Sequence, residues 1–255
     1  MIRPIKNILI TGATSGIGRA LAYEYAQRGA RMILLARRLD LLRQVTEELK
    51  IHGTDAEYVQ CDVRVMDQMR SAISFAEEKL GSIDLAILNA GIGEPEWIRE
   101  FKSEELKKVF EVNLFGIAHA LELLIPIMRK QGFGIIAGVS SMSDNRGFPG
   151  SASYTASKAA ATLLLESARV ELKKYGIDVV TIRPGFVRSE MTAKNEFYMP
   201  LLMQTEKAAR IIAQGIEKRK PLIQFPYRLV FLTEMIRLLP IRIFDYLSTM
   251  VRPGK

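Results

Sequence analysis

The chain has 255 residues, a formal net charge of +8, 48% hydrophobic residues and 25% charged residues. This composition is that of an ordinary globular protein and excludes a disordered or collagen-like chain. The one cysteine, Cys61, excludes an intrachain disulfide and a multi-cysteine metal cluster. The two histidines, His52 and His119, lie far apart in the sequence and argue against a histidine zinc site, so we expect no bound metal.

The N-terminal residues enter a strand-like run without the layout of a signal peptide. No run without Asp, Glu, Lys or Arg exceeds the 13 residues of 131–143. That is shorter than the about 20 apolar residues of a spanning helix. We therefore expect a cytoplasmic protein without a membrane-spanning helix.

Apolar runs typical of strands alternate along the chain with helical patterns. Strands are predicted at residues 7–11, 31–36, 56–60, 83–88, 134–139 and 177–182. Helices are predicted at residues 17–28, 39–51, 65–80, 103–130 and 154–175. Continuous apolar strands separated by helices predict an α/β fold with a parallel sheet covered on both faces. Right-handed crossovers make this a Rossmann-like, doubly wound sheet.

We expect a single domain with a helical extension at its C-terminal end. Residues 1–217 form the Rossmann-type unit, including a substrate lid at about residues 190–217, and residues 218–255 form the extension. Residues 190–203 are rich in Met, Phe, Tyr and Leu. This favours an apolar lid over a lipophilic substrate, although the same side chains could serve packing alone.

A glycine-rich turn follows the first predicted strand and precedes a helix. Glycines at such a turn let the backbone approach a pyrophosphate, and the helix N-terminus offers unpaired N–H groups and partial positive charge. Residues 11–18 follow the pattern T-G-x-x-x-G-x-G rather than the usual dinucleotide fingerprint. The predicted cofactor contacts in this turn are Gly12, Thr14, Ser15, Gly16, Ile17 and Gly18.

Two arginines, Arg37 and Arg38, end the second strand where an NAD-binding protein usually has Asp or Glu. A guanidinium there favours the 2′-phosphate of NADP(H), and NAD(H) is the alternative cofactor. Both arginines could instead be a solvated strand end. Asp62, with Val63 after the third strand, is predicted to contact adenine, but Asp62 could equally be a helix N-cap.

Tyr154 and Lys158 are four residues apart at the start of a helix and therefore share one helix face. A tyrosine has an ordinary pKa near 10, and a neighbouring ammonium is expected to lower it. Such a pair could exchange a proton with a substrate oxygen while a hydride moves to or from carbon.

These and further motifs make the chain resemble the short-chain dehydrogenase/reductase family. Residues 11–18 read T-G-x-x-x-G-I-G, residues 88–91 read Leu-Asn-Ala-Gly, and residues 154–158 read Y-x-x-x-K. Ser141 precedes the tyrosine by thirteen residues, and a Pro-Gly-Phe-Val turn begins at Pro184. The resemblance covers roughly residues 5–192. Leu88 and Arg183 depart from the residues common in the family.

The resemblance implies a role for each matching residue. Tyr154 is expected to be the general acid/base, with Lys158 lowering its pKa and holding the nicotinamide ribose. Ser141 would bind the substrate oxygen, and Asn113 would position a water chain. The implied cofactor contacts outside the glycine turn are Asn89, Ala90, Gly91, Pro184, Gly185, Val187 and Ser189, together with Tyr154 and Lys158.

The implied function is an NADP(H)-dependent oxidoreductase that interconverts a carbonyl and a secondary alcohol. A non-catalytic cofactor-binding scaffold or sensor of the same fold is the alternative. The family resemblance also implies a homodimer or homotetramer, formed through helices 103–130 and 154–175. Leu121, Leu124, Ile125, Leu163 and Leu164 are expected on the outer faces of these helices, unless they are buried within one subunit.

The basic charge is concentrated in residues 218–255, which carry eight Lys or Arg and two Asp or Glu. The remaining chain carries only +2, so a nucleic-acid-binding surface is not expected. Two short helical pieces broken at Pro240 combine apolar and cationic residues, as in helices that lie at a membrane interface. Packing on the protein's own body or on a second subunit is the alternative.

Overall fold

A computed structural model of the chain describes residues 3–194 and 198–250. Within these residues a seven-stranded parallel sheet has the strand order β3-β2-β1-β4-β5-β6-β7. The strands are β1 (Asn7–Thr11), β2 (Arg31–Ala36), β3 (Ala56–Gln60), β4 (Leu85–Leu88), β5 (Gly134–Val139), β6 (Ile177–Pro184) and β7 (Leu222–Phe225). The predicted Rossmann-like α/β fold is confirmed.

The helices follow the strands in the alternation that the sequence predicts. They are α1 (Gly16–Ala26), α2 (Leu39–Ile51), α3 (Met66–Leu80), α4 (Ser103–Phe110), α5 (Gly116–Gln131), α6 (Ala152–Leu172), α7 (Thr205–Glu217), α8 (Tyr227–Leu238) and α9 (Ile241–Ser248). The break between α8 and α9 falls at Pro240, as predicted. Two elements were not predicted, β7 and α7, because β7 has four residues and α7 lies in the segment interpreted as a lid.

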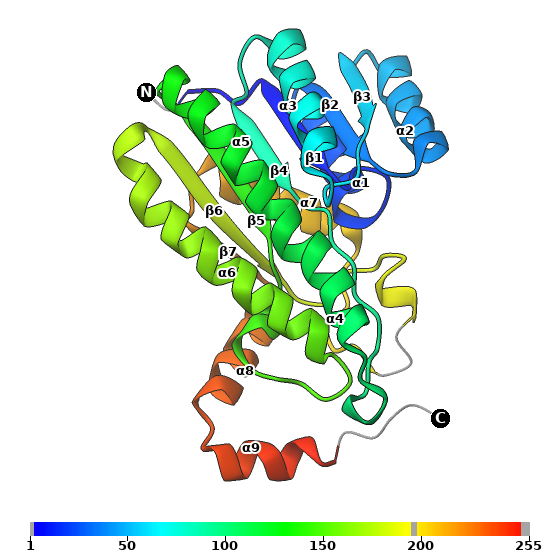
Figure 1. Cartoon of the computed structure of the whole chain (residues 1–255), viewed down its shortest axis with the longest axis vertical. Coiled ribbons are helices and arrows are strands. Elements are labelled where there is room, and N and C mark those ends of the chain that lie inside the picture. Colours follow the sequence, from blue (N-terminus) through cyan, green and yellow to red (C-terminus); the bar gives the residue numbers. More distant parts are fainter. Residues whose placement is uncertain (1–2, 195–197, 251–255) are drawn as a thin grey trace.

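Helices cover both faces of the sheet (Figure 1), and each face has its own hydrophobic core. Ile8 and Ile10 of β1 belong to the core under α1, α2 and α7, whereas Leu9 belongs to the core under α3, α5 and α6. Successive side chains of a strand point to opposite faces, so a fully apolar strand supplies both cores.

The predicted helix at residues 103–130 is one continuous helical stretch with a changed pitch in its middle. A π-helical segment, Glu111–Phe115, joins α4 to α5. By length and composition alone, the stretch Ser103–Gln131 is long and apolar enough to cross a membrane, although the sequence was expected to hold no spanning helix. One side of it nevertheless packs on the sheet, where Ile117, Leu124 and Met128 are buried.

The prediction of which residues lie on the outer faces of helices 103–130 and 154–175 is partly wrong. Leu121 and Leu124 are 6% and 0% exposed and belong to the core. Ile125 and Leu164 are partly buried against the same core, and Leu163 alone of the five is exposed, at 64%. Helical periodicity alone does not say which of two apolar faces meets the sheet.

We predict that Leu124→Ala destabilises the protein by about 2–5 kcal/mol, because it leaves a cavity in the core under α5. The matched control is Ile51→Ala at the end of α2, where the side chain is 81% exposed and the expected change is within about 0.5 kcal/mol. Urea unfolding of both variants measures the difference. Equal stability of the two variants would contradict the placement of Leu124.

Candidate active site

The predicted site residues gather along the carboxyl edge of the sheet. The glycine turn follows β1, Asn89 follows β4, Ser141 follows β5, and Pro184 ends β6. In parallel α/β sheets this edge is where ligands bind, at the point where the strand order reverses. That reversal lies here between β1 and β4.

The glycine turn is shaped for close approach of another backbone. Gly12 and Gly16 have φ values of +68° and +53°, a region that favours glycine. A Cβ on Gly12 would lie 2.9 Å from the Cα of Ala90, and one on Gly18 would clash with the Gly12 carbonyl. Because α1 begins at Gly16, the turn directs unpaired N–H groups of a helix N-terminus outward. This arrangement fits a pyrophosphate.

Asn89 and Thr11 hold the turn from behind. The Asn89 Nδ2 group donates to the carbonyl oxygens of Thr11 and Gly12, both at 3.1 Å. The Thr11 hydroxyl accepts from the backbone N–H groups of Asn89 and Ala90 at 3.0 and 3.1 Å. Asn89 therefore lies beside the predicted cofactor site, where its side chain fixes the glycine turn.

Arg38 lies at the same turn. Its guanidinium donates to the Thr14 hydroxyl at 3.2 Å and to Glu190 at 2.8 Å. Sequence reasoning gave Glu190 no role, because nothing in the sequence places residue 190 beside residue 38. The pair bridges the start of α2 to the segment that follows β6, and closes over the end of the glycine turn.

Asp62 does not cap a helix, which settles one alternative left by the sequence. The N-cap of α3 is Val65, and Asp62 instead accepts from the backbone N–H and guanidinium of Arg64. These hydrogen bonds lower the pKa of the Asp62 carboxyl. Val63 packs against Gly116 and is 7% exposed.

Tyr154 and Lys158 lie in the first two turns of α6 on its inner side. Lys158 is 3% exposed, and its Nζ donates to the carbonyl oxygen of Val139 at 2.8 Å. The Nζ lies 5.8 Å from the centre of the Tyr154 ring. A Cβ on Gly91 would lie 3.3 Å from this Nζ, so the ammonium reaches the loop after β4 as well.

The expected lowering of the Tyr154 pKa is wrong for the chain without cofactor. Burial raises the pKa of Tyr154 above its ordinary value, and a hydrogen bond with Ser141 only partly opposes this. Burial also lowers the pKa of Lys158, to about 8. Loss of hydration is the largest influence on both groups, and the Asp144 carboxylate raises the pKa of each. The phenol is consequently protonated at neutral pH.

Asn113 lies in the π-helical segment and is fully buried. Its side-chain amide pairs with both backbone groups of Ile92 and donates to the Ser157 hydroxyl at 3.0 Å. It therefore joins the loop after β4 to α6 next to Lys158. π-Helical turns inside α-helices are frequent at functional sites.

The remaining predicted residues lie around the same edge. Ser141 caps a short helical turn, and its hydroxyl accepts from the Ser143 N–H at 3.2 Å. Gly185 lies against Leu229 of α8, and Val187 forms an isolated bridge with Met203. A Cβ on Gly16 would lie 3.2 Å from the Cβ of Ser189. The segment after β6 therefore lies next to the glycine turn.

Sequence reasoning missed two features of the site. A Cβ on Gly93 would lie 2.6 Å from Cδ2 of the Tyr154 ring, so this glycine leaves the space that the ring fills. Asp144 and Arg183 form a buried ion pair at 2.5 Å with side chains 2% and 9% exposed. Arg183 was noticed only as a departure from the family pattern, and its partner lies 39 residues away.

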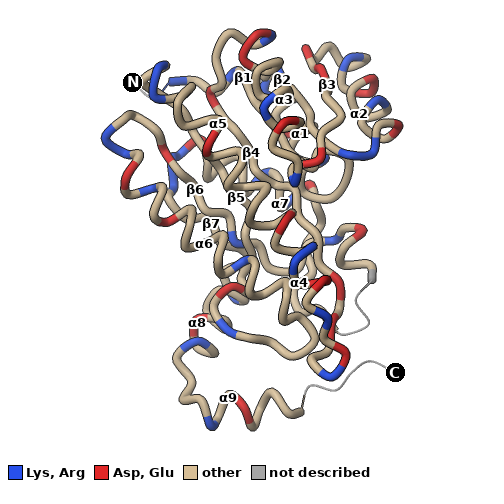
Figure 2. Tube along the Cα trace, in the orientation of Figure 1, with Lys and Arg blue, Asp and Glu red and all other residues tan. Residues whose placement is uncertain are grey.

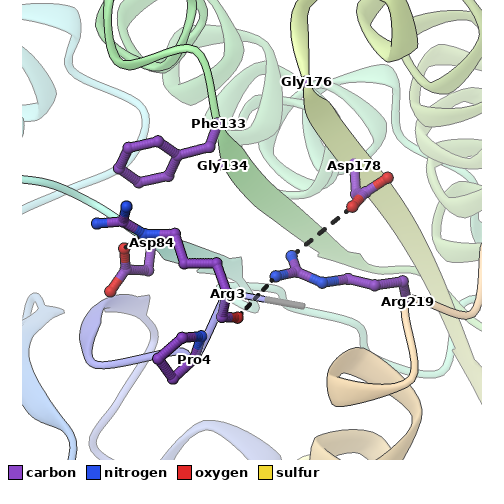
Figure 3. A pocket seen from close by; sticks show the side chains of 8 residues that line it. All are labelled: Arg3, Pro4, Asp84, Phe133, Gly134, Gly176, Asp178 and Arg219. Atoms are coloured by element: carbon purple, nitrogen blue, oxygen red, sulfur yellow. Dashed lines mark hydrogen bonds and ion pairs between the residues drawn. The ribbon is translucent and has the colours of Figure 1, made fainter. Parts of the chain in front are cut away.

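A separate hollow of about 230 Å³ lies at the opposite edge of the sheet (Figure 3). Its charged groups pair with one another, Arg3 with Asp84 at 3.3 Å and Arg219 with Asp178 at 3.7 Å. With two cations and two carboxylates, it shows no excess charge for a ligand. Within residues 3–194 and 198–250, no three His, Cys, Asp or Glu side chains form a cluster that could hold a metal.

Comparison with known proteins places the site in context. A family model described as short chain dehydrogenase matches residues 6–197. An uncharacterized oxidoreductase of Myxococcus xanthus is 36% identical over 247 residues, 97% of this chain and 98% of the relative. The 3-oxoacyl-(acyl-carrier-protein) reductase of Staphylococcus aureus is 35% identical over 188 residues, 73% of this chain and 76% of the relative.

A solved structure resembles the whole chain. It is a short-chain dehydrogenase/reductase from Burkholderia phymatum in complex with NAD. The TM-score is 0.85 at 22% identity, covering 100% of this chain and 98% of the other. At this identity the likeness shows the fold.

We predict that Gly93→Ala lowers kcat tenfold to a hundredfold while the protein stays folded. The added methyl group displaces the Tyr154 ring, and small misplacements of a reacting group are costly. The control is Gly147→Ala, because a Cβ at Gly147 meets no atom within 4 Å. Steady-state kinetics and circular dichroism are the measurements. An unchanged kcat in Gly93→Ala would contradict the packing.

We predict that Tyr154 does not form a phenolate below pH 10 in the chain without cofactor, because burial disfavours the charged form. The measurement is the ultraviolet absorbance of tyrosinate during alkaline titration, taken as wild type minus Tyr154→Phe. Ionisation of this tyrosine near neutral pH would show that Lys158 dominates over burial.

Proposed function

The chain belongs to the short-chain dehydrogenase/reductase family of NAD(P)-dependent oxidoreductases, and from this premise we propose that it is an NADP(H)-dependent enzyme that interconverts a lipophilic ketone and a secondary alcohol. The observation that carries the proposal is the pairing of half-buried Tyr154 with buried Lys158 at the carboxyl edge of the sheet, beside the glycine turn. The non-catalytic scaffold is set aside, because the chain's full-length relative is an oxidoreductase and the predicted catalytic side chains lie together.

The Lys158 ammonium supports the binding of a cofactor at this edge. An ammonium has three donors, and within the described residues the only acceptor of Lys158 is the carbonyl oxygen of Val139. A buried charge with unused donors is costly unless a ligand accepts from them. The hydroxyl groups of a nicotinamide ribose meet this need, between Val139 and Gly91.

The protein's own contribution to the reaction is orientation and proton transfer. A bound nicotinamide supplies or accepts the hydride. In the reducing direction, neutral Tyr154 donates its hydroxyl proton to the carbonyl oxygen as the carbonyl carbon gains the hydride. Ser141 holds this oxygen next to the phenol, and the Lys158 ammonium stabilises the phenolate left behind. The reverse sequence returns the proton to Tyr154.

The preference for NADP(H) rests on Arg37 and Arg38. Arg38 already lies at the glycine turn through its bond to Thr14 and carries a guanidinium suited to a phosphate. The Glu190 carboxylate that pairs with Arg38 has to share or release this guanidinium when a 2′-phosphate binds. NAD(H) remains the alternative cofactor, since the ribose hydroxyls could bind Glu190.

The lipophilic substrate is inferred from the segments that adjoin Ser141 and Tyr154. The loop between them carries Met142 and Phe148, and Trp97 packs on Gly150 at its end. The lid is proposed as residues 190–204, because α7, at residues 205–217, packs on α1 as part of the core. Lid residues 195–197 lie outside the described part of the chain.

We propose a homodimer or homotetramer in the cytoplasm. The exposed apolar side chains on the helices expected to form the interface are Phe115, Leu163 and Val170, at 50%, 64% and 72% exposure. They replace the buried Leu121 and Leu124 as the residues through which subunits would meet.

Tyr154→Phe tests the proposed reaction most simply. We expect NADPH oxidation with a panel of ketones to fall by about 10²–10⁴-fold, because the proton donor is lost while the ring and fold remain. NADPH binding, measured by fluorescence, should change little. Full turnover by the variant would refute the proposed role of Tyr154.

Arg38→Ala tests the cofactor preference. We expect NADPH to bind at least tenfold more weakly, because the guanidinium is lost, while NADH binding changes less than twofold. The matched control is Arg43→Ala on α2, whose guanidinium bonds Tyr58 away from the glycine turn. Equal loss of affinity for both cofactors in Arg38→Ala would contradict 2′-phosphate recognition.

A further inference from the structure

Helix α8 has one face that no other part of residues 3–194 and 198–250 covers. Tyr227, Phe231, Met235 and Leu238 are 76%, 69%, 53% and 82% exposed. Their spacing of three and four residues places all four on the same side of the helix. The opposite side holds Leu229, which is buried against the turn after β6.

Helix α9 and the turn after it also expose apolar side chains, and no residue of α9 is buried. Ile243, Tyr246, Leu247 and Met250 are 48%, 66%, 47% and 58% exposed and are spaced by three, four and seven residues from the first. Figure 1 shows α9 at the end of the molecule, set apart from the sheet. We call these eight side chains, on α8, on α9 and in the turn after α9, the tail face.

Positive charge accompanies the tail face. Arg228, Arg237 and Arg242 are exposed on the same two helices (Figure 2). Glu234 is engaged by Arg183 at 3.6 Å and by Arg237 at 3.5 Å, so Asp245 is the remaining acidic residue of α8 and α9. Exposed apolar stripes flanked by arginine are typical of helices that lie at the surface of a bilayer.

The tail helices also contact the loop between Ser141 and Tyr154. Arg146 donates to the Leu239 carbonyl at 2.9 Å, and its guanidinium lies 4.3 Å from the centre of the Phe244 ring. Phe148 meets Phe244 edge to face at 6.2 Å between ring centres. A surface that binds α8 and α9 therefore also lies close to the loop between Ser141 and Tyr154, which borders the candidate active site.

We propose that α8 and α9 dock on an anionic lipid bilayer, with the tail face in the interface and the arginines among the headgroups. The substrate side of the site then adjoins the membrane, where a lipophilic ketone or alcohol is dissolved. That consequence rests on the proposed function, whereas the docking itself rests only on the tail face.

Charge favours lipid over a second copy of the chain. In a two-fold interface through the tail face both copies would carry the same excess of positive charge, and like charges in an interface are unfavourable. Anionic headgroups neutralise the same arginines, each favourable by about fivefold in affinity near a membrane surface. The bilayer also covers apolar side chains on two helices without needing a matched protein surface.

The test is flotation of the full chain with vesicles of phosphatidylcholine alone and of phosphatidylcholine with phosphatidylglycerol. We expect binding to the second kind, weakened by salt. Phe231→Ser with Leu238→Ser and Tyr246→Ser should weaken it at least tenfold. Replacing Arg228, Arg237 and Arg242 by Gln should weaken it on the order of a hundredfold. The control variant is Ile51→Ser with Ile98→Ser, two exposed apolar residues outside the tail, and should bind like the wild type.

Flotation is combined with analytical ultracentrifugation and an activity assay, so that lipid docking, self-association and enzyme function can be told apart. Absence of binding to phosphatidylglycerol vesicles, or equal binding by the serine triple variant, overturns the proposal. So does a dimer in analytical ultracentrifugation that the triple variant abolishes, because the tail face then covers a second copy. NADPH oxidation with a water-soluble ketone is measured in parallel and should be equal in all variants. Absence of that activity in the wild-type protein would contradict the proposed function and would leave the docking result unaffected.

Discussion

A buried ammonium at the carboxyl edge of the sheet is the constraint on which the site depends. Lys158 is enclosed between α6, the end of β5 and the loop after β4, with one protein acceptor within the described residues. Removing a charge from water without full hydrogen bonding costs free energy, which is consistent with a pKa lowered to about 8. The fold holds this group in an incompletely satisfied state that a ligand with hydroxyl groups can relieve.

The surrounding residues keep that arrangement rigid. Asn113 ties the loop after β4 to α6, and Asn89 ties the same loop to the glycine turn. Gly93 leaves room for the Tyr154 ring. The ion pair of Arg183 and Asp144 joins β6 to the segment that follows Ser141, and Arg183 continues to Glu234 on α8. The glycine-turn edge of the sheet, α6 and α8 are thus connected through polar contacts.

Much of this could be predicted from sequence. The strands β1, β2, β3 and β5 begin and end at the predicted residues. For β1, β2 and β5 the reason is that a strand buried on both faces reads as a nearly continuous hydrophobic run, whereas β3 lies at the edge of the sheet and is only partly buried. The grouping of Tyr154 and Lys158 followed from helix geometry, because residues four apart share a face. The two tail helices followed from their apolar runs and Pro240.

The predictions that were wrong or missing concern properties that depend on how the chain packs in three dimensions. The pKa of Tyr154 was predicted to fall, yet desolvation, which no spacing reveals, raises it. Leu121 and Leu124 were placed outside because an apolar helix does not say which face meets the sheet. The pairs Arg38 with Glu190 and Asp144 with Arg183 join residues 152 and 39 positions apart, which a single sequence cannot connect.

The most direct measurement is the pKa of the Lys158 side chain by NMR, with and without NADPH. Labelled lysine is used, and a Lys158→Met variant assigns the signal. The account predicts a pKa of about 8 in the free protein and a higher value with NADPH bound, because new acceptors stabilise the charged form. An ordinary value near 10.4 in the free protein, or a value that NADPH leaves unchanged, would contradict it.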